Sequence, residues 1–188
     1  MPQIPSSFAP PRYLRSSRIQ TITPSLFRSP QTLAPRCELL ELPDGDFLEL
    51  EWHNEHAPSL VILNHGLEGS TQSGYVRGLV RALTAAGHAV LAWNMRGCGT
   101  RNRLPSWYHS GQSSDLRIVV AHALEHHSGE LSIVGISVGG NILLKYLGEE
   151  NSRVSPRVRS AVAVSVPMDL KGSAAVLAHP RNRIYMQH

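Results

Sequence analysis

The sequence has little cysteine and no long apolar run. Its 188 residues include two cysteines, Cys37 and Cys98, which show neither metal-ligand spacing nor a disulfide framework. No stretch of about 18 apolar residues occurs, so no transmembrane helix is expected. The N-terminus also lacks the apolar run of a signal peptide. These absences indicate a reducing compartment, and we expect a cytoplasmic location.

Charge is scarce as well, at 17% of the residues, and lysine occurs only at Lys145 and Lys171. No basic stripe interleaved with aromatic residues is present, which argues against a nucleic-acid partner. With 41% hydrophobic residues the composition is typical of a folded domain. Residues 1–36 are rich in Pro, Ser and Arg. They predict an irregular extension lying over a domain that begins at residue 37 and continues to 188.

Strand and helix patterns alternate along this domain. Asp44-Gly45 between two apolar runs predicts a β-hairpin over 37–53. The spacing predicts further strands at 59–66, 88–97, 131–137 and 160–167, and helices at 74–87, 113–129 and 138–150. Gly87 is the expected end of the first helix, and Ser113, Ser114 or Asp115 the expected cap of the second. This order predicts an α/β fold with a mostly parallel sheet and helices on both faces.

A short motif carries the chemistry. Gly135-Ile136-Ser137-Val138-Gly139 reads G-x-S-x-G between an apolar strand and a helix, which is the context of a nucleophile elbow. Gly135 and Gly139 lack a Cβ, so strand and helix can approach closely. We predict Ser137 as a nucleophile and the Val138 N–H as one donor to an oxyanion. A phosphate-binding turn is the alternative reading, although G-x-G-x-x-G and P-loop patterns are absent.

An earlier loop, His65-Gly66-Leu67, supplies the expected second donor. Gly66 allows the backbone to face a substrate carbonyl, and the donor would be the Leu67 N–H. His65 is expected to shape this loop by hydrogen bonding rather than to act as the catalytic base.

The acid and the base of a catalytic triad have no good candidates after Ser137. Asp169, His179 and His188 are available, but no strand separates the histidines from Asp169, as the order Ser, Asp, His in such folds requires. Asp169 is better explained as the first residue of a helix that opens a lid from about residue 168. We therefore expect the triad Asp and His to lie outside this chain. The chain would then be an N-terminal fragment, nearly inactive alone, with an exposed apolar sheet edge.

Several blocks together carry a resemblance to one family. They are Arg18 to Ile22, His65 to Ser70 with Tyr75, Asn94 to Gly99, Tyr108 to Gly111, Gly135 to Asn141, and Val164 to Leu170. The chain resembles the YheT-type α/β-hydrolases, an esterase family. The resemblance implies an α/β-hydrolase fold with its C-terminal part missing, a serine carboxylesterase activity through an acyl-enzyme, and no cofactor or metal. The implied partner is a small-molecule ester, with lipid-like esters included.

Other readings stay open at this level. The same apparatus serves acyltransferases and thioesterases, and a hydrolase scaffold can be non-catalytic or inactive through truncation. Gly97 and Gly99 are expected to form a tight turn near the mouth of the site. Cys98 is expected to be a small buried residue, and His109 to pack or cap rather than to bind substrate.

Overall fold

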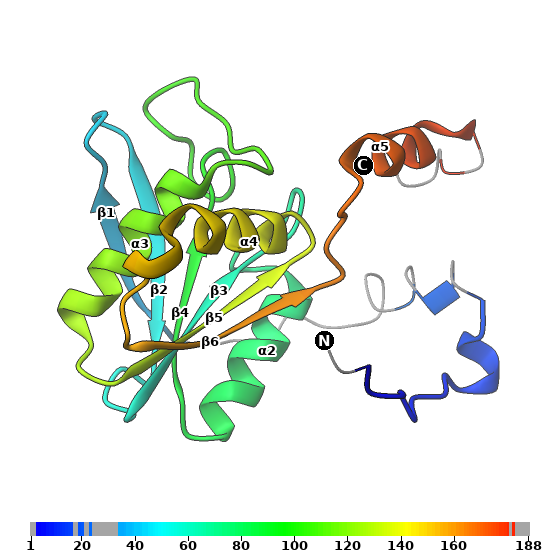
Figure 1. The fold of residues 1–188 in the computed structure, drawn as a ribbon, viewed down its shortest axis with the longest axis horizontal. Coiled ribbons are helices and arrows are strands. Elements are labelled where there is room, and N and C mark those ends of the chain that lie inside the picture. Colours follow the sequence, from blue (N-terminus) through cyan, green and yellow to red (C-terminus); the bar gives the residue numbers. More distant parts are fainter. Residues whose placement is uncertain (1–2, 17–18, 21–22, 24–33, 181, 183–188) are drawn as a thin grey trace.

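A six-stranded sheet with the order β1-β2-β4-β3-β5-β6 organises the computed structural model, which describes residues 3–16, 19–20, 23, 34–180 and 182 (Figure 1). The strands are β1 (Arg36–Glu41), β2 (Phe47–His53), β3 (Ser59–Asn64), β4 (Ala89–Asn94), β5 (Glu130–Ile136) and β6 (Val158–Val164). The β1–β2 hairpin pairs antiparallel with β4, and the remaining four strands are parallel. The predicted α/β fold, with a mostly parallel sheet and an N-terminal hairpin, is confirmed.

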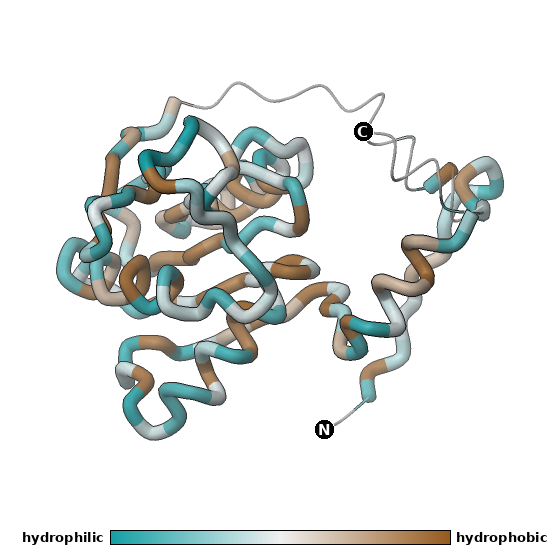
Figure 2. Tube along the Cα trace, turned by 90° about the horizontal axis from the view of Figure 1, so that it is seen from above, coloured by the Kyte–Doolittle hydropathy of each residue, from teal (hydrophilic) through white to brown (hydrophobic). Residues whose placement is uncertain are grey.

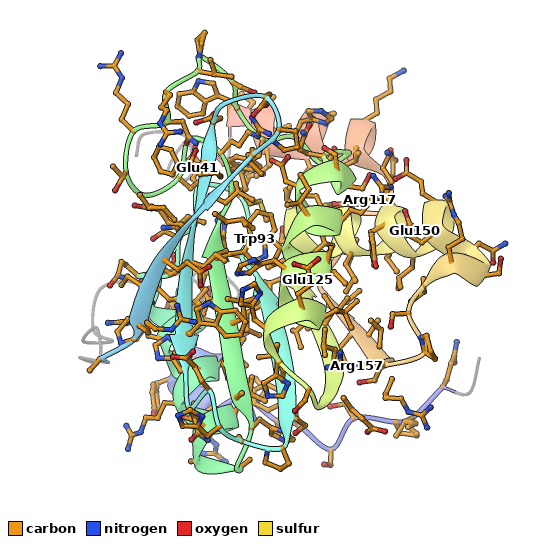
Figure 3. The ribbon with its side chains drawn as sticks, turned by 90° about the vertical axis from the view of Figure 1, so that its left-hand side faces the viewer. Glu41, Trp93, Arg117, Glu125, Glu150 and Arg157 are labelled. Atoms are coloured by element: carbon orange, nitrogen blue, oxygen red, sulfur yellow. The ribbon has the colours of Figure 1, made fainter. Side chains whose placement is uncertain are left out.

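The helices lie on both faces of the sheet, as predicted (Figure 1). They are α2 (Gly74–Ala85), α3 (Ser113–His126), α4 (Val138–Glu150) and α5 (Leu170–Ala178), with the short 3-10 turns η1 (Arg12–Leu14) and η2 (Asn151–Arg153). Helices α3 and α4 cover one face and α2 covers the other. On facing helices, Arg117 donates to Glu150 at 2.5 Å, which ties α3 to α4 (Figure 3).

Each covered face of the sheet has its own apolar core. In Figure 2, brown apolar segments run through the middle of the sheet domain. The larger core lies between the sheet, α3 and α4, and includes Trp93, Leu116 and Ile142, all essentially inaccessible. The smaller core packs α2 against β3 and β4 through Val61, Val80 and neighbours. The strands β3 and β4 are therefore buried on both faces, as continuous apolar runs predict.

Helix α2 ends as its sequence predicts, whereas α3 begins at the predicted residue 113 but without the predicted cap. Gly87 has a φ of +87°, and its N–H and that of His88 donate to Thr84 and Leu83, which is a Schellman motif. At α3 the cap position is Gln112, without a side-chain cap. The expected cap residues have other partners, since Ser113 donates to Glu149 and Asp115 binds Arg96. These long-range contacts override the local capping preference.

The two ends of the described chain contribute little to the core. No described residue before β1 is buried. Helix α5 stands apart from the sheet (Figure 1), and β6 is an edge strand with Val162 and Val164 about half exposed. Within the described ranges, no helix is both long enough and apolar enough to cross a bilayer.

Candidate active site

The turn between β5 and α4 holds Ser137 in an unusual backbone conformation. Its φ is 53° and its ψ is −117°, a left-handed region that L residues other than glycine rarely adopt. The Ser137 N–H donates to the Val164 carbonyl of β6 at 2.8 Å, which fixes the turn against the neighbouring strand. The half-buried Ser137 side chain has no hydrogen-bond partner among the described residues. A strained serine with an uncommitted hydroxyl therefore stands at the carboxyl end of the sheet.

The glycines around this turn are required by space. A Cβ on Gly135 would lie 2.5 Å from the Gly139 carbonyl oxygen, and one on Gly139 would lie 2.7 Å from the carbonyl oxygen of Asn64. Gly139 therefore brings the end of β3 against the first turn of α4. A Cβ on Gly66 would lie 3.4 Å from the Cβ of Ser137, so the loop after β3 passes directly beside the serine.

The structure brings the predicted donors to the same place. Leu67 follows Gly66 in the loop beside Ser137, and Val138 is the first residue of α4. Within the described part of the chain, neither the Leu67 nor the Val138 N–H donates a hydrogen bond. The N-terminal end of a helix also carries a partial positive charge, which favours an anion next to Val138.

His65 has a structural role in this loop, as expected from the sequence. Its side chain is buried, its Nδ1 lies 2.8 Å from the Gly66 carbonyl, and its Nε2 lies 3.1 Å from the Met95 nitrogen. The Met95 N–H must donate to Nε2, so the proton of a neutral ring lies on Nδ1. Burial lowers the pKa of His65, which keeps the ring neutral. With both nitrogens engaged, His65 is not a base for Ser137.

A pocket of about 710 Å³ opens beside the two free amides. Its walls are residues 67–70, 97–99 and 107–110, together with Val138 and Leu170. Gly97 and Gly99 have φ values of +80° and +87°, so the tight turn expected at the mouth of the site is present. Cys98 is only partly buried, and it lines the pocket. Burial raises the pKa of its thiol, which disfavours the reactive thiolate.

An ion cluster surrounds the buried Arg96, the residue before Gly97 of the pocket wall, and was not anticipated from the sequence. The guanidinium of Arg96 donates to Asp115 of α3 at 2.8 and 3.1 Å and to Asp44 of the hairpin turn at 2.5 Å. Its bond to Asp115 raises the pKa of Arg96, so the guanidinium stays charged. The position of Arg96 inside the Asn94–Gly99 block was the only signal in the sequence, and its partners lie 19 and 52 residues away.

Of the residues weighed as acid or base, the described part of the chain contains Asp169 and His179. Asp169 is the N-cap of α5 and accepts a hydrogen bond from the Gly172 N–H at 2.9 Å. This agrees with the prediction that Asp169 is the first residue of a helix. His179 follows the last residue of α5, and His188 lies outside the described residues. Across the described ranges, no group of three or more His, Cys, Asp or Glu side chains is placed to hold a metal ion.

Comparison with known proteins agrees with this architecture. The family model described as the alpha/beta hydrolase fold matches residues 59–181, and the chain belongs to the α/β-hydrolase family. Among curated relatives, it is 36% identical over 191 residues to the YheT protein of Escherichia coli, covering 97% of this chain and 55% of that protein. This relative bears out the resemblance drawn from the sequence blocks.

Two further relatives have names that state an activity. The chain is 31% identical over 125 residues to the monoacylglycerol lipase of Saccharomyces cerevisiae, covering 65% of this chain and 27% of the lipase. The solved structure of the esterase Pf2001 from Pyrococcus furiosus superposes with a TM-score of 0.65 at 21% identity, covering 89% of this chain and 62% of that one, a likeness that shows the fold. The chain spans about half the length, or less, of the curated relatives it matches.

Proposed function

We propose that the protein hydrolyses carboxylic esters through an acyl-enzyme formed on Ser137. One observation carries the proposal: a serine with a φ of 53° stands with an uncommitted hydroxyl beside two peptide N–H groups that have no described acceptor. Strain on a non-glycine residue costs about 1–3 kcal/mol and is found mostly where function requires it. Gly135, Gly139 and Gly66 support the reading as a nucleophile elbow facing an oxyanion hole, because they allow the close approach described above.

The proposed reaction follows from this geometry. The Ser137 oxygen attacks the ester carbonyl carbon, and the C=O π pair moves onto the carbonyl oxygen. The Leu67 and Val138 N–H groups then stabilise that oxyanion, with a helix N-terminus behind Val138. As the tetrahedral intermediate collapses, its bond to the alcohol oxygen breaks, and that oxygen takes up the proton that the Ser137 hydroxyl lost. Water then attacks the acyl carbon, the acid leaves, and a proton from the water returns to the Ser137 oxygen. An Asp–His pair that moves these protons is expected outside the present chain.

The lining of the pocket beside the two amides supports the proposal that the substrate ester carries an apolar group. Leu67, Trp107 and Leu170 line it and expose 59%, 71% and 45% of their surfaces to solvent. Exposed large apolar side chains gathered around one pocket are typical of a site that binds apolar ligands. The lipase among the relatives also supports lipid-like esters as substrates. The low cysteine content supports a cytoplasmic location.

A fluorophosphonate probe tests the nucleophile in the natural protein that carries this chain. We expect the probe to label Ser137, and Ser137→Ala to abolish both labelling and hydrolysis of a nitrophenyl ester. Ser165→Ala is the matched control, because Ser165 also has a left-handed φ, 51°, just after β6 at the same edge of the sheet. Labelling that survives Ser137→Ala contradicts Ser137 as the nucleophile. A folded protein that is never labelled contradicts the proposal and favours a non-catalytic scaffold. Transfer of the acyl group to an added alcohol would indicate an acyltransferase instead of an esterase. A preference for thioesters would indicate a thioesterase.

A further inference from the structure

The loop after β3 leaves one amide free among six consecutive ones. The N–H groups of residues 66 and 68–71 all donate: Gly66 to Tyr75 Oη, Glu68 to Tyr108 Oη, Gly69 to the Gly66 carbonyl, Ser70 to Ser73 Oγ, and Thr71 to Asn94 Oδ1. Only the Leu67 N–H has no acceptor among the described residues. Backbone N–H groups of folded chains are nearly always paired, so a single unpaired one between paired neighbours calls for a reason.

The two amides flanking Leu67 are held in the same way by different parts of the fold. Tyr75, from the first turn of α2, accepts from Gly66 at 2.7 Å, and Tyr108, from the pocket wall, accepts from Glu68 at 2.6 Å. Tyr75 lies nine residues after Gly66, in the next helix, and Tyr108 lies 40 residues after Glu68. Burial raises the pKa of each tyrosine, so both remain neutral hydroxyls that can accept an N–H.

Resting on the proposed function, we propose that Tyr75 and Tyr108 are positioning residues that clamp the loop on both sides of Leu67 and thereby hold its N–H toward the oxyanion position. Glu68 has a φ of 52°, which interrupts any helix or strand at this point. The backbone around Leu67 therefore lacks the hydrogen bonds of regular secondary structure. Two side-chain acceptors replace the hydrogen bonds that a helix or strand would supply. Preorganised donors of this kind need no rearrangement when charge develops, which is why their placement affects the rate.

Removing the hydroxyls tests the clamp. Tyr75→Phe and Tyr108→Phe keep each ring, and the matched control is Tyr146→Phe, because Tyr146 is buried in α4 and its hydroxyl has no described hydrogen bond. The first readout is amide hydrogen exchange, which does not depend on activity. We expect faster exchange at Gly66 in Tyr75→Phe and at Glu68 in Tyr108→Phe, each by about fivefold, which corresponds to the loss of a hydrogen bond of about 1 kcal/mol.

The second readout is kinetic and uses the natural protein that carries this chain. For each tyrosine variant we expect kcat for a nitrophenyl ester to fall about tenfold with KM nearly unchanged, because negative charge develops on the carbonyl oxygen in the transition state and is absent from the bound ester. Tyr146→Phe should change neither exchange at 66–68 nor kcat. Unchanged exchange in the Tyr75 and Tyr108 variants overturns the clamp. Faster exchange with an unchanged kcat overturns the role of the clamp in catalysis. A protein that is never labelled at Ser137 overturns the proposed function, and the exchange result then still shows whether the tyrosines hold the loop.

Discussion

Two tight turns in this molecule use a left-handed backbone for different reasons. In the β1–β2 hairpin, Gly45 has a φ of +88°, and a Cβ there would meet no atom within 4 Å. In the β5–α4 turn the residue with positive φ is Ser137, and the glycines flanking it have ordinary φ but no space for a side chain. At the hairpin, glycine serves the backbone angle alone. At the β5–α4 turn the position with positive φ is occupied by serine instead of glycine, and the flanking glycines are needed for close packing.

The contrast indicates what each turn is selected for. A hairpin turn with glycine at the left-handed position has no strain to relieve. Serine at such a position lowers stability, which supports the proposal that the hydroxyl of Ser137 has a use that glycine cannot supply. The following predictions test this difference, beginning with the largest expected effect.

Exchanging the two residue types at the two turns should produce opposite results. Ser137→Gly should abolish fluorophosphonate labelling, a loss of at least about a thousandfold, and raise the free energy of unfolding by about 1 kcal/mol as the strained φ is relieved. Gly45→Ser should lower the free energy of unfolding by about 1 kcal/mol and leave labelling unchanged. Urea unfolding and probe labelling measure both. A less stable Ser137→Gly variant would show that the serine is not strained.

The packing role of the site glycines can be separated from helix propensity. Gly139→Ala places a methyl group against the carbonyl oxygens of His65 and Asn64 and should destabilise the fold by about 3 kcal/mol. Gly148→Ala lies on the same helix with nothing within 4 Å and should stabilise it by about 0.5–1 kcal/mol. Thermal unfolding of the pair checks this. Equal effects of the two substitutions would contradict the close approach of β3 to α4.

The smallest expected effect is on the pH dependence of stability. The loop beside Ser137 contains a buried neutral histidine, His65, and the hairpin turn contains none. The folded pKa of His65 is lowered by burial from its ordinary value near 6.5. Above about pH 6.5 the ring is neutral in both states, and its contribution to stability is complete. As the pH falls below that value, the unfolded chain binds a proton that the folded protein rejects, so stability declines. His65→Gln should reduce this decline between about pH 6.5 and 5, while His56→Gln, at an exposed position, should not; urea unfolding across pH measures it.

Local patterns in the sequence account for most of the fold. The strand at 130–136 and the helix at 138–150 were predicted within a residue because Gly135 and Gly139 mark the boundary between them. Gly87 likewise marks the end of α2. The capping of α3 was predicted wrongly, because Asp115 pairs with Arg96, and nothing in the periodicity of a helix indicates a partner in the loop after β4.

The site was only partly predictable for the same reason. The positions of Ser137, Leu67 and Val138 follow from motifs read within a few residues of one another. The hydroxyl of Tyr108 reaches the loop from 40 residues away, and that of Tyr75 comes from the helix that follows the loop; both contacts depend on tertiary packing. The sequence indicated these tyrosines only as members of blocks shared with a family, without the hydrogen bonds they make.

A crystal structure of the protein after reaction with a fluorophosphonate would test the central claim most directly, because the bound phosphonate mimics the tetrahedral intermediate. We predict phosphorus bonded to Ser137 Oγ, with one phosphonyl oxygen about 2.7–3.1 Å from the backbone nitrogens of both Leu67 and Val138. A phosphonate on another residue, or an oxygen directed away from these two nitrogens, would contradict the account.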